Sequence, residues 1–280
     1  KRDPSILPDM SSDEMLDTTK IHSIEGTLKR DGLITTRPFR SPHHTVTPVG
    51  LGGGGTGTIR PGEVSLANNG VLFLDELPEF SRTALEVLRQ PIEDGSITIS
   101  RAGQKCTYPC SIMVVAAMNP CPCGYYGDPT RKCTCSEQKI KRYLNRISGP
   151  LLDRFDIHVE VPAVKFEELR DTSSAECSAD IKKRADRARE IQRERFKGSK
   201  TTCNAKINAE QFEKVCVIDK EAEKTLKDAF ESLGLTARAY DRVLKVARTI
   251  ADLDESEIIR SEHVLEAVQY RSLDRKYWAK

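Results

Sequence analysis

The chain has 280 residues, of which 38% are hydrophobic and 31% are charged, and its formal net charge is +2. This length allows one large domain or two ordinary ones, and the nearly balanced charge excludes a global basic field that would steer nucleic acid to the molecule. No apolar run approaches the length of a membrane span and no secretory signal is present, so we expect a cytoplasmic protein without a membrane partner.

The first expected elements are a helix and a glycine-rich loop. Ser11 is a good N-cap and is followed by acidic residues, which predicts a helix from there to about Ile24. Residues 37–63 are rich in Pro, Gly, Thr and Arg, and the glycine run at 50–57 predicts a mobile loop. Because neither Lys-Ser/Thr nor a helix directly follows these glycines, the loop does not match a phosphate-binding loop.

Four apolar residues at 71–74 predict a buried strand that ends in the acidic pair Asp75 and Glu76. In ATP-hydrolysing folds the first carboxylate of such a pair holds Mg²⁺ and the second polarises the attacking water. The plain alternative is an acidic strand end that caps the next helix. The chemistry also needs a loop ending in Gly-Lys-Ser/Thr, which these 280 residues lack, so we expect the chain alone to bind ATP weakly or not at all.

Helix, hairpin and strand follow in that order. Apolar residues at helical spacing predict a helix from Ser81 to Gly95. Residues 97–108 predict a hairpin with a basic tip, and residues 112–118 predict a second buried strand. That strand runs into Asn119. Since ligands bind at the carboxyl ends of parallel strands, we expect Asn119 and the acidic pair to share one nucleotide.

Nine cysteines are present, and four of them lie close together in the sequence. Two Cys-x-Cys pairs, with nine residues between them, could supply the four thiolates of a closed structural zinc site; they are Cys121, Cys123, Cys133 and Cys135. The usual zinc pattern is Cys-x-x-Cys, so four reduced cysteines in a tight loop are the alternative. An odd total does not fit a secreted disulfide framework.

The second half of the chain begins with a helix at 136–148 and a short strand at 157–161. Arg154, between them, is either an arginine that reaches a neighbouring subunit's γ-phosphate or the partner of an adjacent aspartate. From about residue 162 the sequence is rich in charge and has a helical pattern. It predicts one long helix at 179–197, then several helices broken near Asp219, Gly234 and Ser256. Alternating strands and helices followed by helices predict a parallel α/β core and a separate helical domain.

Four segments of the sequence together resemble one family. They are Arg37-Pro-Phe-Arg-Ser-Pro-His43-His44-Thr45, Gly62-Glu-Val-Ser-Leu-Ala-Asn-Asn-Gly70-Val-Leu-Phe-Leu-Asp75-Glu76-Leu-Pro-Glu-Phe, Ala116-Ala-Met-Asn119-Pro-Cys-Pro-Cys-Gly124 and Tyr143-Leu-Asn-Arg-Ile-Ser-Gly-Pro-Leu-Leu-Asp-Arg154-Phe-Asp. They resemble the YifB/ComM family of AAA+ proteins, which is similar to the ATPase subunit of magnesium chelatase. The resemblance covers the chain from about Pro4 to Trp278.

The resemblance implies a role for each candidate site residue. Asp75 and Glu76 match the Walker B pair, and Asn119 matches sensor 1. Arg154 matches the arginine finger, and Arg238 matches the sensor 2 arginine of the helical lid. ATP and Mg²⁺ are the implied cofactors. The family's Walker A loop and its Lon-protease-like domain are expected ahead of Lys1.

The resemblance also implies the architecture. We expect an AAA+ three-layer α/β core of the P-loop type at residues 1–163, without its first part, a charged linker helix at 164–206 and a helical lid at 207–280. The segment at about 37–63 matches the helix-2 insert of this clade, and the hairpin at 97–108 matches its pre-sensor-1 hairpin. Both are expected to face a ring pore and to contact DNA phosphates through basic side chains: Arg101, Lys105, Arg37 and Arg40, with His43, His44 and Arg60 adding to them.

Three functions follow as hypotheses. The first is a hexameric ATP-driven motor for branch migration, which acts on single-stranded or branched DNA. The second is the ATPase subunit of a metal-chelatase complex, which requires partner subunits and no DNA. The third is a non-catalytic module stabilised by zinc. For the basic residues of the hairpin and insert, ordinary solvated loop charge is the alternative to DNA contact, and for His43 and His44 the alternative is a role in stabilising a turn.

Overall fold

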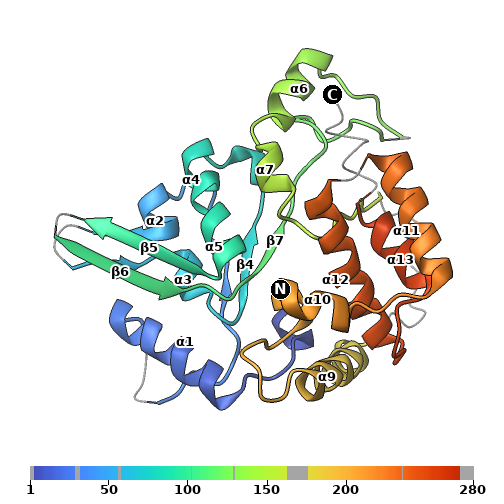
Figure 1. The fold of residues 1–280 in the computed structure, drawn as a ribbon. Helices are drawn as coiled ribbons and strands as arrows, with labels where there is room; N and C mark the ends of the chain where they lie inside the picture. Colours follow the sequence, from blue (N-terminus) through green and yellow to red (C-terminus); the bar gives the residue numbers. More distant parts are fainter. Residues whose placement is uncertain are drawn as a thin grey trace. The chain divides into compact units, whose positions relative to one another are not determined.

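The computed structural model describes residues 3–28, 32–55, 58–101, 103–128, 130–162, 176–234 and 236–271. It divides into two compact units, Asp9–Phe155 and Asp156–Lys280 together with Arg2–Pro8. The first is a mixed α/β unit and the second is helical (Figure 1). Within the described ranges, no helix combines the length and the apolar character that crossing a bilayer requires.

A small parallel sheet forms the centre of the first unit. Its strands are β1 (Phe39–Arg40), β4 (Val71–Leu74) and β7 (Met113–Ala116), in the order β1-β4-β7. Leu74 pairs with Ala116, so the carboxyl ends of β4 and β7 lie side by side. The prediction of a parallel sheet in an α/β unit is confirmed at this level, and the three-layer P-loop core stays a prediction.

The two longer strands differ in burial. Val71, Leu72 and Leu74 of β4 are fully buried, as the apolar run predicted. β7 was also expected to be buried, yet Met113 is 51% exposed and the rest of the strand is half-buried. The physical reason is position: among the described strands, β7 pairs only with β4 and forms the edge of the sheet.

The segment at 37–63, expected to be a mobile loop, holds regular structure in its described residues. It contains β1, the helix α2 (Pro48–Gly52), and two short antiparallel strands, β2 (Gly53–Gly54) and β3 (Arg60–Pro61). A Cβ on Gly53 would lie 2.7 Å from the carbonyl oxygen of Arg60. The glycines therefore allow backbones to approach closely, and the prediction from the glycine run was wrong in this respect.

The first unit also contains several helices. α1 (Ser12–Glu25) begins at the Ser11 N-cap with a complete capping box, as predicted. The helix expected from 81 to 95 is two helices, α4 (Arg82–Val87) and α5 (Arg89–Asp94). Pro91 accounts for the break, because it has no N–H to donate to the carbonyl of Val87. The remaining helical elements are α3 (Glu63–Leu66), the 3₁₀ turn η2 (Leu77–Glu79), α6 (Glu137–Leu144) and α7 (Gly149–Leu152).

A two-stranded hairpin completes this unit and extends as an arm away from the sheet (Figure 1). It consists of β5 (Ser96–Arg101) and β6 (Gln104–Pro109), which confirms the predicted hairpin. At its base, the Tyr108 hydroxyl donates to the carbonyl of Ile59 at 2.8 Å. Hairpin and insert are therefore packed together.

The strand expected at 157–161 is not formed. These residues are irregular, and Val161 is 82% exposed. The alternation of Ile157, Val159 and Val161 imitates a half-buried strand. A strand also needs a neighbour to bond, and the described sheet ends at β7. This expectation was wrong.

The second unit is an assembly of helices around its own core. Its breaks near Asp219, Gly234 and Ser256 fall where the sequence predicted them. Its elements are η1 (Asp3–Ile6), α9 (Ser178–Arg195), η3 (Asn204–Lys206), α10 (Ala209–Val215), α11 (Lys220–Leu233), α12 (Ala237–Leu253) and α13 (Ser261–Gln269). The core includes Leu226, Val243, Leu244, Ala247, Ile259 and Val264.

The expected domain limits were residues 163 and 206. Along the chain, the boundary between the two units falls between Phe155 and Asp156. The helix α9, which lies in the expected linker, belongs to the second unit. Residues 163–175 and 272–280 lie outside the described part of the chain.

Candidate functional site

The acidic pair stands directly after the central strand. Asp75 and Glu76 are exposed, and Asp75 Oδ1 accepts a hydrogen bond from the Glu76 N–H at 2.9 Å. Glu76 has left-handed backbone angles, φ 54° and ψ 46°, which cost a non-glycine residue about 1–3 kcal/mol. Its side chain caps no helix, and α4 is capped by Ser81 instead. The capping alternative is therefore wrong. A strained backbone that carries an exposed carboxylate favours a chemical role for Glu76 over a structural one.

Asn119 lies at the same edge of the sheet, three residues beyond β7, and it is exposed. The N–H of Leu77 donates to the carbonyl of Ala117 at 3.0 Å, which ties the turn after β4 to the end of β7. Burial and the nearby Glu79 carboxylate raise the pKa of Tyr143, while a hydrogen bond with the Asn119 backbone opposes them. Tyr143 of α6 therefore lies against the Asn119 backbone. The two strand ends come together as the sequence predicted.

His44 joins this site, although the sequence assigned it to DNA contact. Its Nδ1 is 3.1 Å from Oε2 of Glu76. The imidazole packs on the ring of His43, with 4.0 Å between centroids, and on Phe80 at 6.4 Å. This contact was not expected from the sequence, because β1 lies within the segment at 37–63. Had β1 been recognised beside β4, a residue shortly after it would have been placed at the same sheet edge.

Arg154 is buried, with 7% of its side chain exposed. It forms an ion pair with Glu93 of α5, and its Nη1 donates to the carbonyl of Pro150 at 2.5 Å. The neighbouring aspartates considered from the sequence are not the partners found here. A role toward a second subunit requires this guanidinium to exchange Glu93 for phosphate.

Arg238 belongs to the other unit. It is the second residue of α12, it is exposed, and it follows the Thr236 N-cap. Its place at the start of a helix agrees with the sequence reading, and its sensor 2 role stays a prediction.

Two of the basic residues expected at a DNA-binding surface have partners inside the first unit. Arg37 bonds Glu14 and the carbonyls of Asp9 and Asn69, the last at 2.7 Å. Arg40 makes a two-pronged ion pair with Glu63, at 2.6 and 2.7 Å, and this bond raises the pKa of Arg40. Both guanidinium groups hold the fold together here, which leaves the hairpin as the better phosphate-binding candidate.

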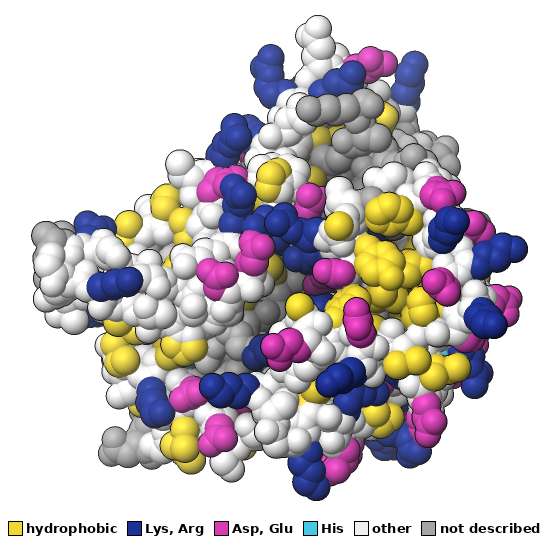
Figure 2. Space-filling model, in the orientation of Figure 1, with side chains coloured by type: hydrophobic (Ala, Val, Ile, Leu, Met, Phe, Trp, Pro, Cys, Tyr) yellow, Lys and Arg dark blue, Asp and Glu magenta, His cyan; other side chains and the backbone are white. Residues whose placement is uncertain are grey.

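Arg101 and Lys105 are exposed near the tip of the hairpin. Ser100 pairs with Lys105 across the two strands, so the two cations lie within one residue of register. Figure 2 shows Lys and Arg side chains, in dark blue, along the arm that Figure 1 labels β5 and β6. A local basic patch on an otherwise balanced molecule is what a phosphate contact needs.

A second basic surface was not recognised from the sequence. An open cleft of about 860 Å³ lies beside η2 and α6, and its cations are Arg82, Lys141, Arg142 and Arg146. Arg146 bonds Glu79 at 2.7 Å. The available signal was the cluster of basic residues at 139–146, which the sequence analysis treated only as a helix.

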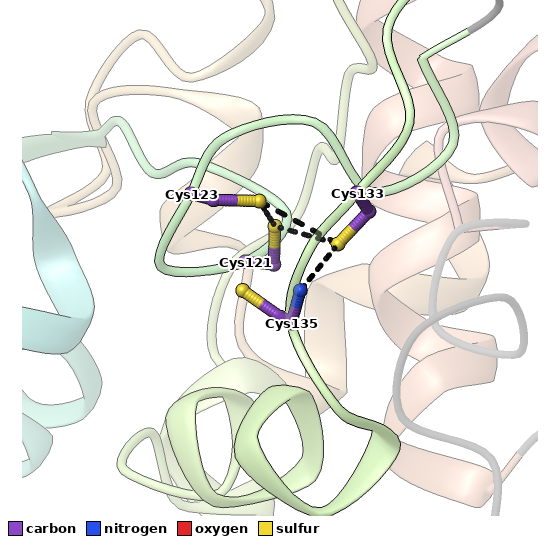
Figure 3. Close-up of side chains that lie close together, drawn as sticks. All are labelled: Cys121, Cys123, Cys133 and Cys135. Carbon is purple, nitrogen blue, oxygen red and sulfur yellow. Dashed lines mark hydrogen bonds between the residues drawn. The ribbon is translucent and has the colours of Figure 1, made fainter.

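The four clustered cysteines do come together. All four sulfur atoms lie within 4.8 Å of one another, in the segment between β7 and α6 (Figure 3). Backbone N–H groups of Tyr125 and Thr134 lower the pKa of Cys123 to about 5, whereas burial and the neighbouring sulfurs raise the pKa values of Cys133 and Cys135. The chain therefore holds a thiol cluster of a size that fits one metal ion, directly after Asn119.

Taken together, a parallel sheet with an acidic pair and a polar residue at adjacent strand ends, followed by a helical unit, defines a module of the magnesium-chelatase AAA+ kind. A family model described as "Magnesium chelatase, subunit ChlI" matches residues 1–169, and one described as "Magnesium chelatase, subunit ChlI C-terminal" matches residues 175–271. The chain belongs to the YifB/ComM family within this class, and the relatives below carry that assignment.

The chain is 46% identical to protein YifB of Escherichia coli (strain K12) and 44% identical to competence protein ComM of Haemophilus influenzae. Each alignment covers 96% of this chain and 52% of the relative, so the chain spans about half the length of the curated relatives it matches. A more distant match is the maternal DNA replication licensing factor mcm6 of Xenopus tropicalis, 24% identical over 76% of this chain and 26% of that protein.

Proposed function

We propose that this chain is the ATP-hydrolysing module of a ring-shaped motor that remodels single-stranded or branched DNA, and that it drives branch migration. In this proposal Asp75 holds Mg²⁺, Glu76 polarises the attacking water, and Asn119 helps to position that water. Arg238 contacts the nucleotide from the helical unit. The observation that carries the ATPase part is the meeting of Asp75, Glu76 and Asn119 at the carboxyl ends of two paired parallel strands.

The local environment supports the assignment of Glu76 as the polarising base. Its carboxylate is exposed and lies 3.1 Å from the imidazole of His44. Its backbone is left-handed, and its side chain makes no helix-capping hydrogen bond. A carboxylate placed in this way can accept a proton from a water molecule once it exchanges the His44 contact for that water.

The DNA part of the proposal is supported by the hairpin. Arg101 and Lys105 are exposed on an arm, while Arg37 and Arg40 are engaged by Glu14 and Glu63. Phosphate contacts of this kind give affinity without sequence specificity, which suits a motor that moves along DNA. Two relatives point the same way, since one is named a competence protein and another a DNA replication licensing factor.

The motor requires copies of itself as partners. A hexameric ring is the assembly that the family resemblance implies, and in it Arg154 of one subunit acts on the nucleotide of the next. An arginine supplied in this way stabilises the charge that develops on the transferred phosphoryl group.

The test is ATP hydrolysis by a form that also carries a phosphate-binding loop ahead of residue 1, with and without single-stranded and branched DNA. Glu76→Gln should lower DNA-stimulated turnover by about 10²-fold or more, because an amide cannot take the proton from water. Nucleotide binding, read with a fluorescent ATP analogue, should stay. Glu79→Gln is the matched control, since it alters an exposed carboxylate on the same turn.

Two results would count against the motor. Hydrolysis that is indifferent to DNA, and that rises only with added partner subunits, would favour the metal-chelatase ATPase, a function suggested by the name of the matching family model. No hydrolysis in any form would leave a non-catalytic module.

A further inference from the structure

The four clustered cysteines have the spacing of ligands around one ion. The sulfur of Cys121 lies 3.3 Å from that of Cys123 and 3.7 Å from that of Cys133, and Cys123 lies 3.5 Å from Cys133. A tetrahedron with zinc–sulfur arms of about 2.3 Å has edges of about 3.8 Å. A disulfide, in contrast, has sulfurs about 2.05 Å apart. Figure 3 shows the sulfur atoms of Cys121, Cys123 and Cys133 close together, with the side chain of Cys135 beside them.

Backbone N–H groups point at two of the four sulfur atoms. The N–H of Cys135 points at the sulfur of Cys133, with 3.4 Å between the atoms, and the N–H groups of Tyr125 and Thr134 donate to Cys123. Hydrogen bonds of this kind offset the charge of metal-bound sulfur and orient it. Without an ion, four thiols in mutual contact, three of them reached by solvent, would contribute little to the fold.

The loop between the two pairs is built to return on itself. Gly124 and Gly127 have positive φ angles of 83° and 82°, which glycine adopts without strain. Asp128 closes the turn by accepting the backbone N–H groups of Thr130 and Arg131, at 2.6 and 2.9 Å. The two Cys-x-Cys pairs are thereby brought face to face although residues 124–132 separate them.

We propose that Cys121, Cys123, Cys133 and Cys135 bind one Zn²⁺ in a closed structural site. Four thiolates complete a tetrahedral shell, which leaves no open position for a substrate or a catalytic water. All the sulfurs lie within 4.8 Å of one another, which is too compact for thiolates spread over two irons. Mononuclear binding by soft ligands therefore favours zinc over a cluster.

The ion would tie two parts of the first unit together. Cys121 is fully buried two residues after Asn119, and Cys135 directly precedes Ser136, the N-cap of α6. The metal thus links the end of β7 to the start of α6, from which Tyr143 reaches back to the Asn119 backbone. Asn119 is held between a core strand and the metal site, and zinc acts as its positioning element. This last step rests on the proposed ATPase function.

The first experiment measures metal in the whole chain, purified without chelator. Inductively coupled plasma mass spectrometry should find about one zinc per chain, with little iron. Cys135→Ser should lose most of this zinc, whereas Cys177→Ser, at an exposed cysteine outside the cluster, should keep it. A second measurement does not depend on the folding of Cys135→Ser: the reduced metal-free wild type is titrated with Co²⁺, which should give the visible absorption of tetrahedral cobalt thiolate.

A chain that arrives without metal, and that takes up no Co²⁺ after reduction, overturns the site. A chain that binds one iron instead overturns the choice of zinc. Neither readout depends on ATP. If zinc is bound but the form that carries a phosphate-binding loop does not hydrolyse ATP, the zinc site stands and the proposed function fails.

The positioning role has its own readout. Removal of the metal should raise tryptic cleavage after Arg131 and Lys132, while cleavage in the helical unit stays constant. In the form that hydrolyses ATP, Asn119→Ala should lose turnover and keep its zinc, whereas Cys135→Ser should lose both. Full turnover by a zinc-free Cys135→Ser protein would reject the positioning role.

Discussion

Arg154 is the residue whose expected role and observed contacts differ most. An arginine finger must be free to reach the next subunit, yet this side chain is buried and paired with Glu93. Breaking a buried pair by removing one partner leaves an uncompensated charge, so the contact has a structural consequence of its own. The two roles can be separated because the pair has two ends, and only one of them is a candidate for catalysis.

We expect Arg154→Ala to lower ATP hydrolysis by the assembled, loop-containing form by about 10³-fold or more, with nucleotide binding kept, because the charge on the transferred phosphoryl loses its partner. Turnover and binding of a fluorescent ATP analogue are the measurements. Glu93→Gln breaks the same ion pair and leaves the guanidinium in place. If it costs as much turnover as Arg154→Ala, the role of Arg154 is structural.

At this scale the sequence predicted what is local and missed what is distant. Asp75, Glu76 and Asn119 were placed correctly at one sheet edge, because each directly follows its own strand. His44 was assigned to DNA contact, since only the pairing of β1 with β4 brings it to Glu76. Arg37 and Arg40 were read as free cations because the sequence does not reveal that Glu14 and Glu63 fold onto them.

At the scale of elements, the hairpin is where the DNA-binding hypothesis can be tested most directly. Its two tip cations lie in adjacent registers on β5 and β6 and have no part in the core. We expect the double variant Arg101→Ala, Lys105→Ala to weaken single-stranded DNA binding for all sequences alike. The slope of log affinity against log salt should become less steep by about 1.4, because two phosphate contacts are lost.

Fluorescence anisotropy over a series of salt concentrations measures this slope. Lys20→Ala on α1 is the matched control, because Lys20 is an exposed cation of the same unit that pairs with Asp17, one turn away on the same helix. An unchanged slope in the double variant would show that the hairpin does not contact phosphate.

The helix α12 carries a buried polar network centred on Asp252. Asp252 is fully buried and accepts bonds from Arg195 at 2.8 Å and from Asn204 at 2.7 Å, and Arg248 lies 3.0 Å from it. Asp252→Ala would leave these donors without a counter-charge. We expect it to lower the free energy of unfolding of this unit by about 3–5 kcal/mol, as measured by urea unfolding followed by circular dichroism.

Asp241→Ala removes an exposed carboxylate from the same helix and should stay within about 0.5 kcal/mol of wild type. Equal stability of Asp252→Ala and wild type would mean that the buried network is energetically neutral. The sequence predicted a helix between the breaks near Gly234 and Ser256 but gave no hint of this network, since its members lie on α9, η3 and α12 and come together only in the fold.

Across the whole molecule, two units fold around separate cores, and each contains a deeply buried thiol. Cys110 is 1% exposed in the first unit and Cys216 is 7% exposed in the second. Burial raises the pKa of each thiol to about 11 from an ordinary value of 9.0. The folded state therefore keeps these protons at a pH where the unfolded chain has released them.

This difference fixes the sign of a pH effect. Below pH 9.0 both thiols are protonated in the folded and in the unfolded chain, so the free energy of unfolding is not reduced by them there. As the pH rises toward 11, the unfolded chain releases these protons first and the free energy of unfolding falls. Each thiol should lower the free energy of unfolding by at most about 1.4 kcal/mol per pH unit within that window. Urea unfolding between pH 8.5 and 10.5 measures the slope.

Because tyrosines and lysines titrate in the same range, the informative quantity is the slope that Cys110→Ala and Cys216→Ala remove together, compared with Cys106→Ala and Cys203→Ala at less buried positions. If both pairs of variants show the wild-type slope, the buried thiols are not the source of the alkaline loss, and the cores of the two units tolerate a thiolate.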